Sequence, residues 1–201
     1  MADLDETSDP VDGRVARRQR NVDAVVDVVL EMFAEESMFP TIEQAANRSG
    51  LSLRSLYRYF ADPGELLEAA IKRSRLQGEE LSRLHVIGQG PLARRVDEIV
   101  AMRLRLYGTV GPVYRATVAN AARHERVCHE LARNRNDMRD QFEIHFAPEL
   151  LALKSADRDV VLSAGDLLIQ LDSIDYLRRH RRLSAAKTQS VLASTLYSLL
   201  S

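Results

Sequence analysis

The chain of 201 residues has little of what a disulfide scaffold or a membrane protein needs. It contains one cysteine, Cys128, which excludes an internal disulfide framework and fits a reducing compartment. The N-terminal segment is acidic rather than basic and then apolar, which is unlike a signal peptide. Its apolar stretches fall far short of the roughly 20 residues that span a bilayer. We therefore expect a cytoplasmic protein with no membrane segment.

The sequence also lacks the short motifs of common enzyme classes. It has no P-loop, no Gly-x-Gly-x-x-Gly fingerprint, no His-Glu-x-x-His and no nucleophile elbow, so we expect no enzymatic activity. The stretch RHERVCHE places His124 one helical turn from Cys128 and Glu125 one turn from His129, a spacing that can hold a metal. No second group of ligands completes such a site, and we expect no metal and no other cofactor.

Apolar residues recur at helical spacing over nearly the whole chain, and no alternating pattern of useful length predicts a strand. A Gly, a Pro or a Ser stands at each predicted join between helices. Beyond residue 84 the expected helices cover 92–107, 113–123, 125–145, 156–179 and 184–200. The sequence therefore predicts an all-α fold with about nine helices.

The stretch TIEQAANRSGLSLRSLYRYF, from Thr41 to Phe60, predicts two short helices joined by a tight turn. Thr41 is a good N-cap for the first, Gly50 suits the left-handed residue that ends it, and Ser52 caps the second. Two such helices after a longer first helix form a helix-turn-helix.

The second of these short helices divides into two faces. At 100° per residue, Leu56 and Phe60 face the core with Tyr57 on their flank. The residues expected on the exposed side are Arg54, Ser55, Arg58 and Tyr59. A helix that enters a DNA major groove needs this division, because one stripe anchors it and the other reaches phosphates and base edges. A solvated surface helix also exposes arginines, so the pattern alone leaves both interpretations open.

Net charge does not decide between them, since 28 basic residues stand against 29 acidic ones. Locally, an acidic segment over residues 1–13 without periodicity predicts a disordered tail, and Arg14 to Arg20 then form a basic cluster. The cluster is either an arm that follows the DNA backbone or enters the minor groove, or only the front of the first helix. We favour the arm, because cations are unfavourable at a helix N-terminus.

The segment TIEQAANRSGLSLRSLYRYFADPGELL resembles the N-terminal domain of the TetR family of transcriptional regulators. Its cap threonine, buried alanine, Gly-x-Ser turn and Leu-Tyr-x-x-Phe helix stand at the family spacing, and the similarity covers Arg17 to about Leu67. The resemblance implies a helix-turn-helix DNA-binding domain over 14–62 and a larger helical effector-binding and dimerisation domain over 63–201. It implies a ligand-responsive repressor that binds a near-palindromic operator in double-stranded DNA as a homodimer. The alternative is an architectural or partner-binding helical protein without operator specificity.

The same resemblance assigns roles on the DNA. Thr41 and Tyr59 are expected to hold phosphates and Tyr57 to pack against the backbone. Ser52 to Ser55 are expected to read bases, with Gln44 reaching in from the preceding helix. The full expected set is Arg17, Arg18, Thr41, Gln44, Ser52, Leu53, Arg54, Ser55, Tyr57, Arg58 and Tyr59.

Two further sets of residues are expected in the C-terminal two thirds of the chain. The candidate dimer interface, on the last two predicted helices, is Leu168, Leu171, Val191, Thr195, Leu196 and Leu199. Two such helices per subunit would form a four-helix bundle. The candidate effector pocket is Met102, Leu106, Tyr107, Tyr114, Val118, Met138, Phe142, His145 and Phe146, which suggests a small, mostly apolar effector. Both sets would serve equally well as intramolecular core.

Overall fold

The computed structural model describes residues 10–36 and 40–201, and the regular structure of these residues is all helical, as expected. In chain order the helices are α1 (Pro10–Glu36), α2 (Ile42–Ser49), α3 (Leu53–Tyr59), α4 (Pro63–Glu79), α5 (Leu92–Asn120), α6 (Glu125–His145), α7 (Ala147–Ala152), α8 (Ser155–Ile169), α9 (Leu171–Asp175) and α10 (Ala185–Leu200). A 3₁₀ turn (Ala121–Arg123) follows α5, and a π-helical turn (Tyr176–His180) follows α9.

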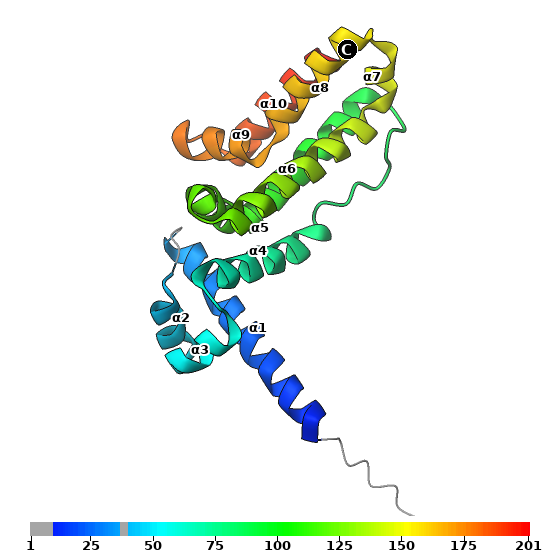
Figure 1. Cartoon of the computed structure of the whole chain (residues 1–201). Helices are drawn as coiled ribbons and strands as arrows, with labels where there is room; N and C mark the ends of the chain where they lie inside the picture. The colour runs from blue at the N-terminus through cyan, green and yellow to red at the C-terminus, as the bar shows by residue number, and fades with distance from the viewer. Residues whose placement is uncertain (1–9, 37–39) are drawn as a thin grey trace, which may run out of the picture.

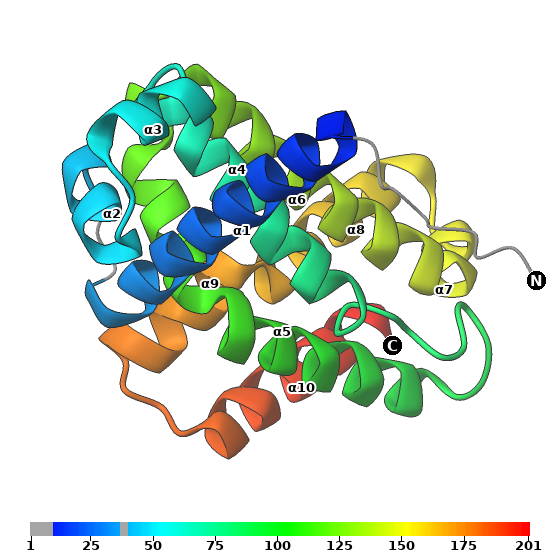
Figure 2. The same cartoon turned by 90° about the horizontal axis from the view of Figure 1, so that it is seen from below.

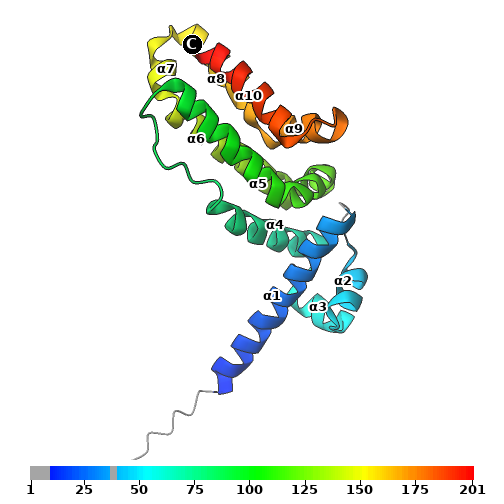
Figure 3. The ribbon, with the colours of Figure 1, turned by 180° about the vertical axis from the view of Figure 1, so that it is seen from behind.

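The helices are arranged as a small head and a layered body. Helices α1 to α3 form the head, α4 joins it to the pair α5 and α6, and α8, α9 and α10 form the layer farthest from the head (Figure 1). The view from behind shows the same order of layers (Figure 3). Seen from below, α1 lies across α4, with α2 and α3 beside one end of α1 (Figure 2).

The predicted caps of the helix-turn-helix are present. The Thr41 hydroxyl accepts a hydrogen bond from the Gln44 N–H at 3.1 Å, and the Thr41 N–H donates to the Gln44 side chain at 2.8 Å, which completes a capping box. Gly50 ends α2 with a φ of 70°, a conformation that glycine adopts without steric cost. Ser52 caps α3 and Asp62 caps α4 through side-chain oxygens. These caps fix the angle at which α3 leaves α2.

The head and α4 share one hydrophobic core. Val25, Val29 and Phe33 of α1 are fully buried against α2, α3 and the inner face of α4. The cluster continues past α4 to Val113 of α5 and Val127 of α6. The buried face of α4 belongs to this core, while α4 also packs against α5 and α6 of the body. The expected domain boundary at residue 62 therefore falls inside a continuous core.

The N-terminus of α1 differs from the expectation. Residues 1–9 of the predicted disordered tail lie outside the described residues, but α1 already begins at Pro10, so residues 10–13 are helical. Arg14 to Arg20 thus continue the helix and are not an extended arm. Proline suits the first helical position, and Ala, Arg and Gln favour helix. Because α1 begins at Pro10, Arg14 to Arg20 lie beyond its first turn, where the unfavourable effect of a cation on the helix dipole has fallen off.

Helix α5 runs without interruption through the break expected at residues 108–112, with Pro112 inside it. An internal proline costs about 3 kcal/mol, because it removes a helical hydrogen bond and crowds the preceding turn. Here α5 packs against α4, α6, α9 and α10, and this burial outweighs the local penalty.

The helix expected over 156–179 is instead broken at Gln170, whose ψ of 151° is that of extended backbone. The Gln170 amide donates to the Arg135 carbonyl at 3.2 Å, and this contact with α6 holds the break in place. A further helix, α7, occupies the join that was expected at Pro148. Arg95 of α5 forms an ion pair with Glu149 of α7 and donates a hydrogen bond to the carbonyl of His145, the last residue of α6. These bonds hold α7 against α5.

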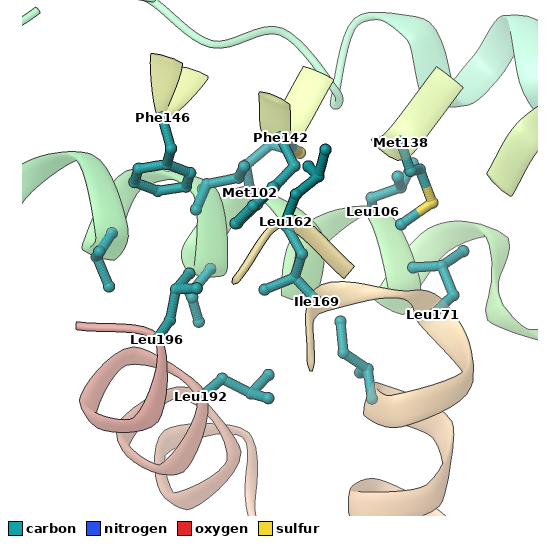
Figure 4. Packing of buried hydrophobic residues seen from close by; sticks show 14 of the residues in the cluster. Met102, Leu106, Met138, Phe142, Phe146, Leu162, Ile169, Leu171, Leu192 and Leu196 are labelled. Atoms are coloured by element: carbon teal, nitrogen blue, oxygen red, sulfur yellow. The ribbon is translucent and has the colours of Figure 1, made fainter. Parts of the chain in front are cut away.

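The body has its own core between the layers. Phe142 of α6, Phe146 between α6 and α7, Met102 of α5 and Leu196 of α10 are all fully buried and pack together (Figure 4). Gly165 lets α8 approach this cluster closely, because a Cβ atom there would overlap the ring of Phe142.

We expect Gly165→Ala to destabilise the protein by roughly 1–3 kcal/mol, since the added methyl group meets a fully buried ring that has no room to move. The free energy of unfolding is measured in urea. Gly108→Ala in α5 is the matched control, because a Cβ there meets nothing within 4 Å. That change should stabilise by about 0.5–1 kcal/mol, as alanine does for glycine within a helix. Equal effects of the two changes would contradict the close approach of α8.

Candidate nucleic-acid interface and ligand cavity

The outer face of α3 carries a row of exposed side chains. Arg54 and Arg58 are exposed, as expected, while Leu56 and Phe60 are buried in the head. Tyr57 has 54% of its surface exposed and Leu53 37%, so both stand on the same outer side as the arginines. This face offers charged, aromatic and apolar groups together.

Tyr59 does not lie on the exposed strip where the sequence placed it. Its ring is buried, with 8% exposed, because it follows Leu56 by three residues and therefore lies only 60° from it on the helix. The Tyr59 hydroxyl accepts from Asn21 of α1 at 3.0 Å and from Arg58 at 3.2 Å, and these bonds lower the pKa of Tyr59. Tyr59 thus supports the Arg58 guanidinium, which also lies 5.3 Å from its ring centroid.

The arginines of α1 extend the exposed face of α3. Residues 13–20 are all exposed, on the part of α1 that projects past α2 and α3 (Figure 1). The charge of Arg17 contributes to the lowered pKa of Tyr59, which places Arg17 near the end of α3. Arg17 and Arg58 therefore both lie near Tyr59, and Arg18 is exposed at the next position of α1.

The remaining predicted contact residues already serve as caps. Thr41, Gln44 and Ser52 are exposed and Ser55 is half-buried. The Gln44 amide oxygen and the Thr41 hydroxyl bind backbone N–H groups, and the Ser52 hydroxyl lies 2.9 Å from that of Ser55. These groups hold the turn in shape and stand at the edge of the surface that Arg54 and Tyr57 form.

A cavity of about 260 Å³ lies between α4, α5 and α6, with Leu171 of α9 also in its lining. Three of the nine predicted pocket residues, Leu106, Tyr114 and Met138, line this cavity. The other lining residues are Ile71, Ser74, Arg75, Gly78, Glu79, Ser82, Arg103, Val110, Val113, Thr117, Asn134, Arg135, Asp137, Gln141 and Leu171. The cavity touches α4 along much of its length, and α4 carries the head.

Six predicted pocket residues lie elsewhere. Met102, Phe142 and Phe146 fill the body core (Figure 4). His145 is buried beside Phe146, its Nε2 lies 3.2 Å from the Arg95 carbonyl oxygen, and burial lowers its pKa. The two others are Tyr107, whose hydroxyl donates to Asp175 at 2.7 Å, and Val118, which is 39% exposed. Helical spacing identifies apolar side chains, but the void between facing helices is a property of their packing.

Several polar and charged groups lie among the apolar side chains of the cavity lining. Tyr114 donates to Asp172, and Arg135 contacts both oxygens of that carboxylate at 3.0 Å. Burial and the neighbouring carboxylate raise the pKa of Tyr114. Two more guanidinium groups, of Arg75 and Arg103, also line the cavity. A mostly apolar effector stays a prediction, and the charged groups in the lining favour an effector that also carries a polar group.

Sequence reasoning missed these arginines because arginine on a helix usually points to solvent. One signal was available for Arg103. It continues the apolar stripe of Val96, Ile99 and Val100 at helical spacing, so a charge falls on an otherwise buried face. A charged residue on a buried helix face is a better sign of a cavity-lining position than the apolar residues around it.

The predicted dimer interface is corrected in part. Leu171 and Leu196 are buried within the subunit, at 4% and 0% exposed, and belong to the body core. The other predicted residues remain at least partly exposed: Leu168, Val191 and Leu199 are half-buried, and Thr195 is exposed. The large apolar side chains exposed on the outer layer are instead Val160 and Leu167 of α8, Tyr176, and Tyr197 of α10. Helical periodicity could not tell the inner faces of these helices from their outer faces, and the dimer interface stays a prediction.

Within the described residues, no group of three or more His, Cys, Asp or Glu side chains is placed to hold a metal ion. Cys128 is an exposed free thiol. None of the helices that the structure describes is both long enough and apolar enough to cross a membrane.

Comparison with known proteins is consistent with this arrangement. No protein-family model matches the chain. It is 36% identical over 86 residues to the helix-turn-helix-type transcriptional regulator BetI of Escherichia coli, and 35% identical over the same length to BetI of Klebsiella pneumoniae. Each match covers 42% of this chain and 43% of the relative, so it spans less than half of the relative's length.

Solved structures are similar over most of the chain. A TetR-family transcriptional regulator from Streptomyces coelicolor has a TM-score of 0.71 at 20% identity, over 90% of this chain and 80% of that one. The multidrug binding protein EbrR, solved with imidazole, has a TM-score of 0.65 at 17% identity, over 100% of this chain and 98% of that one. At these low identities, the structural similarity establishes the fold alone. The BetI matches relate the sequence to transcriptional regulators rather than to enzymes. With its capped helix-turn-helix and its Leu-Tyr-x-x-Phe third helix, the chain is similar in sequence to the regulator BetI over 86 residues and shares its fold with TetR-family transcriptional regulators.

Proposed function

We propose that this protein is a ligand-responsive repressor that binds a near-palindromic DNA operator as a homodimer. The observation that carries the proposal is the exposed face of α3, where Arg54, Tyr57 and Arg58 stand outward while Leu56 and Phe60 anchor the helix. A helix supported on one side and polar on the other fits the major groove, which is about 12 Å wide.

The proposed contacts divide into two classes. Leu53 and Arg54, on the first turn of α3, face base edges, where Leu53 offers only an apolar contact such as one to a thymine methyl group. Arg17 and Arg18 of α1, with Arg58 held by Tyr59, face phosphates. Thr41 and Tyr57 are also proposed to contact the backbone. Ser52 and Ser55 join Leu53 and Arg54 at base edges, with Gln44 reaching in from α2.

A dimer is proposed because two half-sites one helical turn of DNA apart require two reading helices. The outer faces of α8 and α10 are the proposed seam. Val160 and Leu167 lie seven residues apart, on one side of α8, and are 67% and 65% exposed. Tyr197 of α10 adds a third exposed apolar group to the same outer layer. Paired α8 and α10 helices from two subunits would bury these side chains in a four-helix bundle.

Effector control is proposed to pass through α4. A molecule in the cavity contacts Ile71, Ser74 and Gly78 of α4, and the buried face of α4 is part of the head core. Displacing α4 would change the separation of the two α3 helices in the dimer. Ligand and operator then oppose each other, with a coupling free energy that is the same in both directions.

Footprinting on the DNA beside the protein's own gene tests the proposal. Protection of an inverted repeat with half-sites about 34 Å apart supports an operator-binding dimer. Uniform weak protection over all sequences would instead support an architectural protein without operator specificity.

Arg54→Ala should relax the base preference at one position in each half-site and cost roughly 1–3 kcal/mol of specific binding. Band-shift titrations against the operator and against unrelated DNA measure the change. Arg94→Ala, at an exposed arginine near the start of α5, is the matched control and should leave both affinities unchanged. If Arg54→Ala weakened both DNA molecules equally, Arg54 would be a phosphate contact and not a base reader.

A further inference from the structure

The cavity between α4, α5 and α6 holds a buried positive charge without a matching negative one. Arg103 of α5 has 1% of its surface exposed and lines the cavity. Its Nη2 donates to the Met138 carbonyl at 3.0 Å, and its Nη1 lies 3.9 Å from the Met102 sulfur. Its Nε is buried with no hydrogen-bond partner. Buried charged groups are almost always paired, because leaving one unpaired costs far more than leaving a neutral polar group.

The nearest negative charge is already engaged. Asp166 of α8 acts on Arg103 only through space, and its carboxylate accepts from Gln170 at 2.5 Å and lies 3.5 Å from Arg139. Among the ion pairs formed by the described residues, none includes Arg103. Burial lowers the pKa of Arg103 to about 10, which still leaves the guanidinium charged at neutral pH. The cavity therefore contains a cation that the protein itself does not neutralise.

The other charged groups of the cavity have closer partners or face solvent. Arg135 is bound by Asp172, and Asp137 is exposed and lies 3.8 Å from Arg75. Glu79 is exposed to solvent, where its charge is screened. The Nε of Arg75 is also buried without a partner, so a second donor is available beside Arg103.

The rest of the lining is suited to an apolar chain. The apolar walls are Ile71, Leu106, Val110, Val113, Met138 and Leu171. A liquid water molecule occupies about 30 Å³, so a cavity of about 260 Å³ corresponds to about nine such volumes. A monocarboxylate with a hydrocarbon part of about eight carbons has a similar number of heavy atoms.

We propose that the effector is a small amphiphilic monocarboxylate, whose carboxylate pairs with Arg103 while its hydrocarbon part packs against the apolar walls. The effector role rests on the proposed function, whereas binding of the carboxylate to the cavity does not. A single charge matches the one uncompensated guanidinium, and a second charge would remain unpaired in the cavity. A carboxylate supplies two acceptor oxygens, which suit the Nε and Nη donors of one guanidinium edge.

The test uses four eight-carbon probes on the whole chain: octanoate, octanol, octylamine and octyl phosphate. Isothermal titration calorimetry should show that octanoate binds roughly 10- to 150-fold more tightly than octanol, the range expected for a hydrogen bond to a charged group. Octylamine should bind more weakly than octanol, because it places a cation beside Arg103. Octyl phosphate should bind more weakly than octanoate.

Arg103→Met is the decisive variant, since methionine is similar in length and removes the charge. It should abolish the preference for octanoate over octanol, and its melting temperature should be unchanged or higher, because an unpaired buried charge has been removed. Arg103→Lys should retain part of the preference. Arg83→Met, at a side chain that is 70% exposed, is the matched control and should bind octanoate as the parent does.

The proposal is overturned if octanoate binds no better than octanol, if octylamine binds best, if no probe binds at millimolar concentration, or if Arg103→Met keeps the full preference. Operator binding is measured separately by band shift with the parent and Arg103→Met. Operator release by a neutral or cationic ligand would leave the proposed function standing and contradict the carboxylate. Octanoate binding without any operator binding would contradict the proposed function alone.

Discussion

Replacing Val160 and Leu167 together with glutamate is expected to convert the protein to a monomer that binds its operator about 10²- to 10⁴-fold more weakly. Both side chains are about two-thirds exposed in a single subunit and lie on the same side of α8. Glutamates there would place like charges opposite each other across the proposed seam and would be desolvated without partners. The loss in affinity is the avidity that a second linked head supplies.

Sedimentation measures whether the variant is a monomer, and band-shift titration measures its affinity for the operator. The matched control replaces Val86, in the loop before α5, and Ile144 of α6 with glutamate, at positions 44% and 57% exposed. It adds the same charge away from α8 and α10 and should remain a dimer with unchanged operator affinity. A Val160 and Leu167 variant that stayed dimeric would move the interface to another face of the molecule.

The second large expected effect is the loss of operator affinity as the salt concentration rises. If three to five groups of each head contact phosphates, the dimer makes about six to ten such contacts, and operator affinity should fall roughly 10³- to 10⁵-fold between 50 and 200 mM salt. The exposed arginines of α1 and Arg58 of α3 are the proposed source. Titrations at four or five salt concentrations give the slope of log affinity against log salt.

Replacing Arg17 and Arg18 with alanine should make that slope shallower by about 3 to 4, since two cations are lost from each of two subunits at about 0.9 apiece. The same change should weaken specific and unrelated DNA alike, because phosphate contacts carry no sequence information. Alanine at Arg83 and Arg94, two exposed arginines outside the head, should leave the slope unchanged. A nearly flat salt response of the parent protein would contradict the α1 contacts and with them the proposed docking of the head.

Local signals in the sequence were sufficient for the helix-turn-helix. The caps at Thr41, Ser52 and Asp62 and the left-handed Gly50 depend on side chains within three residues of the backbone that they bind. Such interactions are visible in the sequence because their partners are its neighbours. The buried positions Leu56 and Phe60 followed from helical spacing for the same reason.

Errors arose where a contact between distant segments decided the outcome. The Tyr59 hydroxyl was expected to face DNA, but it accepts a hydrogen bond from Asn21, 38 residues earlier. Pro112 remains inside α5 because that helix packs against five other helices, α1, α4, α6, α9 and α10. The break at Gln170 is fixed by a carbonyl of α6. Periodicity measures spacing along one helix and carries no information about which other helix lies opposite.

The sequence by itself determined that the chain is helical, where the second helix of the helix-turn-helix begins and ends, and which residues of that helix anchor it. Only the tertiary structure decided which apolar residues fill the core and which stand on the outer layer, and that the cavity encloses the charge of Arg103. The physical reason is that caps and helical periodicity act within a few residues. Burial and cavities are instead created by packing between residues such as Arg103 and Met138, 35 positions apart.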